Sequence, residues 1–221
     1  ALGCIEDDAI TVTDDSTVNI IEGAGGADTL IVSGNASVNG VYGGGDGADN
    51  SADADGNDSI TIDTTGTVAL VDAGAGDDQI AVNNGRVGQV LGGDGDDTTT
   101  WTGGLIGYFF GGDGSDELEV AEGLYDGSQV LDGGDDASTA DGMIDTLTLH
   151  GQKVVGNGAT LRNWELMNFD GGADVDLTDV VTETINAACG GSTTIGGASN
   201  VGSALGCIED DAITVTDDST V

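Results

Sequence analysis

The sequence predicts an all-β fold, a parallel β-solenoid whose coils are about 19 to 20 residues long. Short alternating segments of Val, Ile and Leu recur at this spacing along most of the 221 residues. A turn rich in Gly and Asp precedes most of these segments. The chain has 41 Gly and no Pro, and it has no long run of good helix formers, so a predominantly helical fold is excluded.

The repeating unit is clearest after Asp78. Apolar side chains follow this residue at regular offsets, and GGDGD then leads to Asp97, where the series restarts and runs to Asp116. Two units carry about ten extra residues, at 46–55 and 135–144. Similar units start at Asp8, Asp28 and Asp58, the last with one extra residue before its second half. A period of about 20 residues with strand-like pieces is typical of a solenoid.

Alternation along each unit assigns side chains to the core. In the unit of Asp58, Ile60 and Ile62 share one face and Thr61 lies on the other. We expect two stacked rows of core side chains, one formed by Ile10, Leu30, Ile60, Ile80, Thr99, Leu118 and Leu147, the other by Val12, Val32, Ile62, Val82, Trp101, Val120 and Leu149. The segment 146–203 keeps this rhythm only loosely, and Asp174 is out of register in it.

A second, longer repeat spans the chain. Residues 1–18 and 204–221 both read ALGCIEDDAITVTDDSTV. We interpret 1–203 as one solenoid repeat and 204–221 as the start of the next identical one. This predicts that the partners of the chain are copies of itself, in tandem or end to end.

The cysteines fit the same repeat. Cys207 is the copy of Cys4, so each repeat holds two cysteines, and Cys189 lies 18 residues before Cys207. This distance is close to one coil, so Cys189 and Cys207 are candidates for a disulfide across the repeat junction, which requires an oxidising compartment. Two small buried thiols are the alternative.

The charge of the chain excludes several functions. There are 41 acidic side chains and three basic ones, for a formal net charge of −38. Arg86, Lys153 and Arg162 cannot form the basic patch that nucleic acids require. No stretch of 18 apolar residues is present, so we expect no membrane insertion. The scarcity of bases, with a single histidine, His150, also argues against the solenoid enzymes that act on acidic sugars, and we expect no enzymatic activity.

The acidic residues are mostly aspartates: 33 are Asp and eight are Glu. Asp in Gly-rich segments indicates turns and the binding of hard cations. Stacked coils place such carboxylates about 5 Å apart, where each neighbouring pair repels by about 0.9 kcal/mol even in bulk water. Counter-ions are therefore expected, and Ca²⁺ suits carboxylate and carbonyl oxygens. A halophilic acidic surface, or aspartates that only cap turns, are the alternatives.

Two turns fit a known calcium-binding pattern. Residues 111–119 (GGDGSDELE) and 92–100 (GGDGDDTTT) match G-G-x-G-x-D-x-U-x, and 74–80 and 23–30 are degenerate versions. Here the chain resembles the RTX family of secreted proteins. The resemblance implies that Ca²⁺ lies between turns, bound by glycine-loop carbonyls and by the sixth-position aspartates Asp28, Asp58, Asp78, Asp97, Asp116 and Asp145. It adds Asp77, Asp94, Asp96 and Asp113 in the same loops as candidate ligands.

The chain departs from that family in having the motif at only one edge of each coil, which predicts one calcium row instead of two. A weaker resemblance, in rhythm only, is to the coils of bacterial autotransporter passengers. In the first insertion, Asp53 and Asp55 belong to a D-x-D-G-x-D segment that resembles the calcium loops of EF-hand and dockerin-like sites, without their downstream Glu. Each of the two insertions is either a loop that calcium orders or a flexible acidic loop.

Together these features predict a structural repeat module of an extracellular, cell-surface protein: a calcium-stabilised fibre, sheath or surface layer. The alternative is one repeat of a giant RTX-like adhesin that binds surface glycans or other surfaces. An adhesin needs an irregular exposed patch, and 146–203 is the only segment that offers one.

Overall fold

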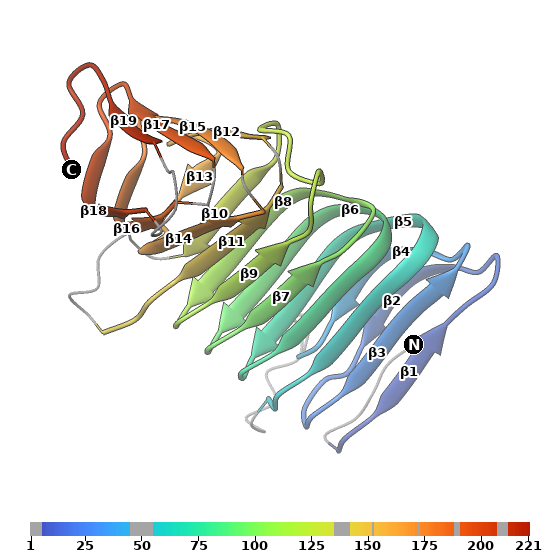
Figure 1. Cartoon of the computed structure of the whole chain (residues 1–221). Helices are drawn as coiled ribbons and strands as arrows, with labels where there is room; N and C mark the ends of the chain where they lie inside the picture. The colour runs from blue at the N-terminus through green and yellow to red at the C-terminus, as the bar shows by residue number, and fades with distance from the viewer. Residues whose placement is uncertain are drawn as a thin grey trace. The chain divides into compact units, whose positions relative to one another are not determined.

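The computed structural model describes residues 6–44, 55–134, 142–151, 153–171, 173–187, 191–206 and 212–221 (Figure 1). Every regular element among these residues is a β-strand, and the strands stack in parallel as a β-solenoid, which confirms the predicted fold class. No helix in the described part of the chain has the length and apolar character needed to cross a membrane. The chain divides into two compact units, Ala1–Asp113 and Gly114–Val221.

In the first unit each coil supplies two strands. The strands that follow the Gly- and Asp-rich turns pair in the order β1 (Ala9–Val12), β3 (Thr29–Gly34), β5 (Ser59–Ala75), β6 (Gln79–Asp94) and β7 (Thr98–Trp101), side by side in Figure 1. The returning strands are β2 (Thr17–Glu22), β4 (Ser37–Tyr42), the later parts of β5 and β6, and β8 (Leu105–Asp113). All these pairs are parallel, as a coil requires.

The register confirms the coil length and the insertions. Thr29 pairs with Ser59, 30 residues on, whereas Ser59 pairs with Gln79 at the ordinary distance. The spacing between these two paired strands is therefore ten residues longer than the ordinary one, as the first insertion predicts. Between β5 and β6 the register shifts after Ile62, which accounts for the one extra residue that the sequence places in the coil of Asp58.

The second unit contains a separate sheet in addition to two sets of strands like those of the first unit. One set pairs in the order β9 (Glu117–Val120), β11 (Thr146–His150), β14 (Leu166–Asp170), β16 (Val181–Asn186) and β18 (Asn200–Leu205), and β10 (Val130–Gly134) pairs with β13 (Leu161–Arg162). A separate sheet is formed by β12 (Lys153–Asn157), β15 (Asp174–Thr178), β17 (Ser192–Gly196) and β19 (Ala212–Val215). This added sheet explains why 146–203 has a looser rhythm and why Asp174 is out of register.

The two core rows lie where alternation places them. All their members are buried except Ile10, which is half-buried in the first coil. Trp101 and Trp164 have no exposed surface. The indole N–H of Trp164 donates to the carbonyl oxygen of Leu131 at 3.0 Å, so this ring fills the core and also satisfies a backbone acceptor.

Glycine is required where corners of successive coils touch. Gly93 has a φ of 128°, and a Cβ placed on it would overlap the carbonyl oxygen of Gly74 in the preceding coil. Gly123 has a φ of 78°, but no atom lies within 4 Å of its hypothetical Cβ. The two positions therefore separate the cost of backbone conformation from the cost of coil-to-coil contact.

Candidate functional site: a row of buried aspartates

Six of the predicted ligand residues occupy the same place in their coils. Each immediately precedes the first strand of its coil, and each is only 1–2% exposed. They are Asp28, Asp58, Asp78, Asp97, Asp116 and Asp145. We call this set the aspartate row. Burial of so many carboxyl groups is costly unless each is hydrogen-bonded, protonated or paired with a cation.

In the first unit one oxygen of each carboxylate binds the preceding coil. The Oδ1 atom of Asp28 accepts the backbone N–H of Asp8 at 2.6 Å. In the same way, Asp58 accepts the backbone N–H of Asp28 at 2.7 Å. Asp78 accepts the N–H of Asp58 at 2.7 Å, and Asp97 accepts the N–H of Asp78 at 2.8 Å. The row therefore joins neighbouring coils through hydrogen bonds from backbone N–H groups to carboxyl oxygens.

The second unit continues the pattern with one change of residue. Asp145 Oδ1 accepts the N–H of Asp116 at 2.9 Å, and Glu165 Oε2 accepts the N–H of Asp145 at 2.6 Å. Glu165 is 3% exposed and directly precedes β14. The sequence analysis missed it because it followed aspartates only. Its spacing of 20 residues from Asp145 was the available signal.

The other carboxylate oxygen is the unusual feature of the row. The Oδ2 atoms of Asp28, Asp58 and Asp78 are buried, and none of them has a hydrogen-bond partner in the described part of the chain. The oxygens of Asp28 and Asp58 lie against Gly23 and Gly43, where a Cβ would overlap them. These oxygens therefore lie against backbone, and a negative charge on them is costly unless a proton or a cation neutralises it.

The pKa values of the row reflect this environment. Burial, reinforced by the charges of Asp78, Asp55 and Asp28, raises the pKa of Asp58 to about 8, against the opposing hydrogen bond from the Asp28 N–H. Burial likewise raises the pKa of Asp78 to about 6, and burial raises the pKa of Asp28. Without a cation, Asp58 is therefore largely protonated at neutral pH.

Asp55 brings the end of the first insertion to the row. Its carboxylate accepts the backbone N–H groups of Ala75 at 2.9 Å and Gly56 at 3.2 Å. Burial raises its pKa. Burial also raises the pKa of the half-buried Asp72, and the charge of Asp55 adds to the raised pKa of Asp72, Asp58 and Asp78. Sequence analysis selected Asp55 but overlooked Asp72, which lies within β5 and outside the glycine turns.

The remaining candidates form an exposed outer row or cannot be placed. Asp77, Asp94, Asp96 and Asp113 are all exposed. Asp77 Oδ1 accepts the N–H of Asp96 at 3.1 Å, so it also links two coils. Asp53, Cys189 and Cys207 lie outside the described residues.

The described residues contain no cluster of three or more His, Cys, Asp or Glu side chains arranged as a metal site. The aspartates of the row are spread along the coils, one at the start of each of six coils, with glycine backbone between them. Such a row offers one or two carboxylate oxygens and nearby carbonyl groups to each cation, which suits an ion that accepts flexible oxygen coordination. It does not offer a nucleophile or an acid–base pair with an evident substrate cleft.

Comparison with known proteins gives no relative from which a function can be transferred: no family model, no curated protein and no solved structure matches the chain.

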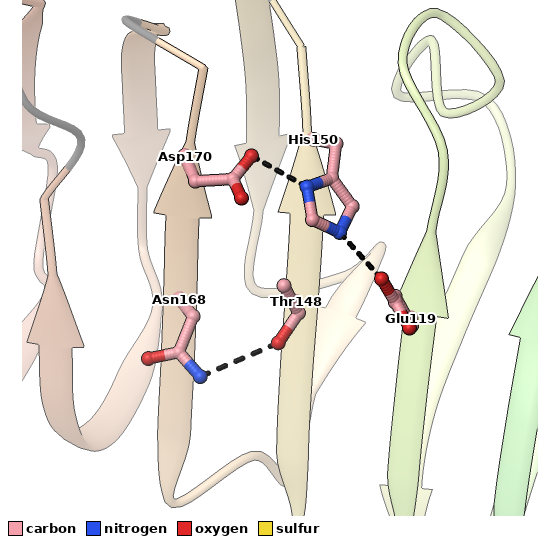
Figure 2. Close-up of polar contacts among 5 residues, drawn as sticks. All are labelled: Glu119, Thr148, His150, Asn168 and Asp170. Carbon is pink, nitrogen blue, oxygen red and sulfur yellow. Dashed lines mark hydrogen bonds and ion pairs between the residues drawn. The ribbon is translucent and has the colours of Figure 1, made fainter.

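His150 has a role that the sequence did not indicate. It ends β11 on the outer face, where its Nδ1 lies 2.5 Å from Asp170 Oδ1 and its Nε2 lies 2.9 Å from Glu119 Oε1 (Figure 2). Burial acts to lower the pKa of His150, but the two hydrogen bonds and the two negative charges outweigh it and raise the pKa. The imidazolium thus joins three neighbouring strands.

We expect His150→Gln to make stability less dependent on pH. The folded-state pKa is raised, so the stabilisation is complete below the unfolded-state value of about 6.5 and is lost as pH rises through the folded-state value. Because both carboxylates are about half exposed, the effect should be only about 0.5–1 kcal/mol. Urea unfolding of both proteins on either side of this range measures it. An equal loss of stability at high pH would contradict the ion-pair explanation.

Proposed function

We propose that the chain is a structural repeat module of an extracellular calcium-stabilised fibre, sheath or surface layer. The observation that carries this proposal is the aspartate row, in which buried Oδ2 atoms recur coil after coil. A stacked solenoid transmits load along its axis through many identical contacts, and the row places a charge-dependent contact at each coil. The proposed role is mechanical and non-enzymatic.

Calcium is the cation that fits these residues best. The donors are carboxylate and backbone oxygens, which are hard ligands, and His and Cys are too scarce for a transition-metal row. Mg²⁺ demands a near-octahedral shell and gives up its waters reluctantly, so enclosed oxygens beside glycine backbone suit it poorly. When bound, Ca²⁺ supplies the positive charge that lets the row remain ionised.

A thermal melt followed by circular dichroism tests this proposal. We expect the β signal to melt at a much higher temperature in millimolar Ca²⁺ than in excess chelator, and Ca²⁺ to restore it after chelation. Mg²⁺ serves as the matched cation. A melting temperature that does not change with Ca²⁺ but rises steeply in molar monovalent salt would instead indicate a halophilic acidic surface.

One feature favours the adhesin alternative as a second candidate. The segment that adds the separate four-stranded sheet also contains a depression of about 320 Å³, lined by Gly158, Leu161, Arg162, Asn163, Asp179 and Val181. Arg162 is one of only three basic residues, and its guanidinium contacts Asp132 at 2.6 Å. Binding of a surface glycan that is lost in Arg162→Gln, with the fold unchanged, would support this second role.

A further inference from the structure

We infer that the segment shared by both ends of the chain is a two-sided junction, and that the outer edge of β1 is the docking surface for the coil β17–β18 of a second copy. The inference rests on the proposed role as a repeat module and deepens it, because it names the partner strands and their register. It does not depend on calcium.

The copy near the C-terminus shows how the segment docks on the coil before it. β19 pairs with β17 in parallel, with Ser192 opposite Ala212 and Ile195 opposite Val215. The backbone N–H groups of the segment act as donors at this edge. Ala212 donates to Gly191 at 3.4 Å, Thr216 to Ile195 at 2.9 Å and Thr220 to Ser199 at 3.0 Å.

The first copy shows how the same residues bind the coil after them. β1 pairs only with β3 among the described strands. At this edge the carbonyl oxygens of the segment act as acceptors: Asp8 from Thr29 at 2.8 Å, Asp14 from Asn35 at 2.9 Å and Ser16 from Ser37 at 2.9 Å. The two edges are complementary parts of one parallel strand, so a segment between two repeats can use both at once.

Backbone shape and burial agree with this interpretation. Asp14 and its copy Asp217 both have a φ of 59°, a conformation that few residues other than glycine adopt. Val12 is 7% exposed, whereas its copy Val215 is 45% exposed. The turn at Asp14 thus has the same backbone conformation as the turn at Asp217. The valine of the segment is buried as Val12, where a following coil packs on it, and exposed as Val215, where no described coil follows.

No described strand pairs with the other edge of β1, and the partner we assign to this edge is a second copy. Residues 9–17 present the same N–H groups that Ala212, Thr216 and Thr220 use, and Thr13, Asp14 and Ser16 are exposed. The contact is head-to-tail, the kind of interface that extends into a filament when its rotation does not close a ring. Within one chain, residues 212–221 already cover β17–β18 and compete with a second copy at an effective concentration of about 1 mM.

The test weakens the binding of residues 212–221 to β17–β18 in the full chain, so that this coil becomes available to a second copy. The released chain carries Ala212→Pro with Thr216→Pro, which removes two of the backbone N–H groups through which the C-terminal segment binds β17, and circular dichroism checks that the fold is kept. Sedimentation velocity should then show that the average mass at least doubles across a concentration series, while the unaltered chain stays monomeric. The matched control adds Ala9→Pro and Thr13→Pro, whose N–H groups face away from β3; this chain should return to the monomer.

Cysteine cross-linking checks the register in the released chain. With Cys4, Cys189 and Cys207 replaced by Ser, Thr11→Cys and Thr194→Cys should form disulfide-linked ladders, because Thr214, the copy of Thr11, lies opposite Thr194. Ala9→Cys with Thr194→Cys is out of register, about 8 Å apart, and should not. A folded released chain that stays monomeric, assembly that survives the four prolines, or equal cross-linking of both pairs would overturn the inference. Failure of the calcium melt alone would leave it standing.

Discussion

Asp58→Asn is expected to stabilise the protein in chelator at about pH 8 and to destabilise it in Ca²⁺. Asn keeps the oxygen that accepts the Asp28 N–H and removes the charge that burial disfavours. The pKa of Asp58 lies about four units above its ordinary value, and each unit corresponds to about 1.4 kcal/mol. The gain in chelator should therefore be a few kcal/mol. In Ca²⁺ the same substitution removes a proposed ligand.

The sign of this prediction follows from linkage. A carboxyl group with a raised folded-state pKa favours folding most when it is protonated, so its contribution is complete below about pH 4 and is lost as pH rises through about 8. The difference between Asp58→Asn and the wild type in chelator should consequently vanish near pH 4. Urea unfolding at both pH values measures it.

Asp63→Asn is the matched control, because Asp63 lies in the same coil as Asp58 but is exposed and is not a candidate ligand. It should change the free energy of unfolding by less than about 0.5 kcal/mol, with or without Ca²⁺. If Asp58→Asn destabilises the protein equally in chelator and in Ca²⁺, the carboxylate acts only through its hydrogen bond, and the row caps turns without binding a cation.

Gly93→Ala is expected to destabilise the first unit by more than about 3 kcal/mol. Its Cβ would overlap the carbonyl oxygen of Gly74, and backbone of a neighbouring coil cannot move aside as a flexible side chain can. The positive φ adds strain of about 1–2 kcal/mol.

Gly123→Ala isolates the second of these costs. It shares the positive φ but meets no neighbouring atom, so its loss should stay at about 1–2 kcal/mol. Equal losses for the two variants in denaturant unfolding would show that coils are not in close contact at the Gly93 corner.

Sequence periodicity predicted the coils because each coil repeats the same local rule. Ile60, Ile62 and their counterparts alternate with outward residues, and like side chains stack on like ones, so the core rows follow from spacing alone. The ten-residue insertions and the extra residue after Asp58 could also be counted. The aspartate row was selected by residue type and position, and its placement at the start of each coil is confirmed.

Features that depend on contacts between distant residues were not predictable in the same way. In the sheet β12–β15–β17–β19 the spacing between paired residues varies, from 21 for Lys153 with Asp174 to 18 for Val175 with Thr193, so a template of 19 to 20 residues loses it. Glu165 replaces Asp with a longer side chain that reaches the same N–H. The partners of His150 are 20 and 31 residues away, and only the register brings them together.

The most direct test of the central claim is to measure proton release when Ca²⁺ binds. Titration calorimetry at about pH 7, in buffers of different ionisation enthalpy, reports binding and proton release together. Because Asp58 is largely protonated in the absence of a cation, Ca²⁺ binding at the row should release about one proton, and Asp58→Asn should abolish that release. Binding without proton release, or no binding, would contradict the claim that calcium neutralises the buried row.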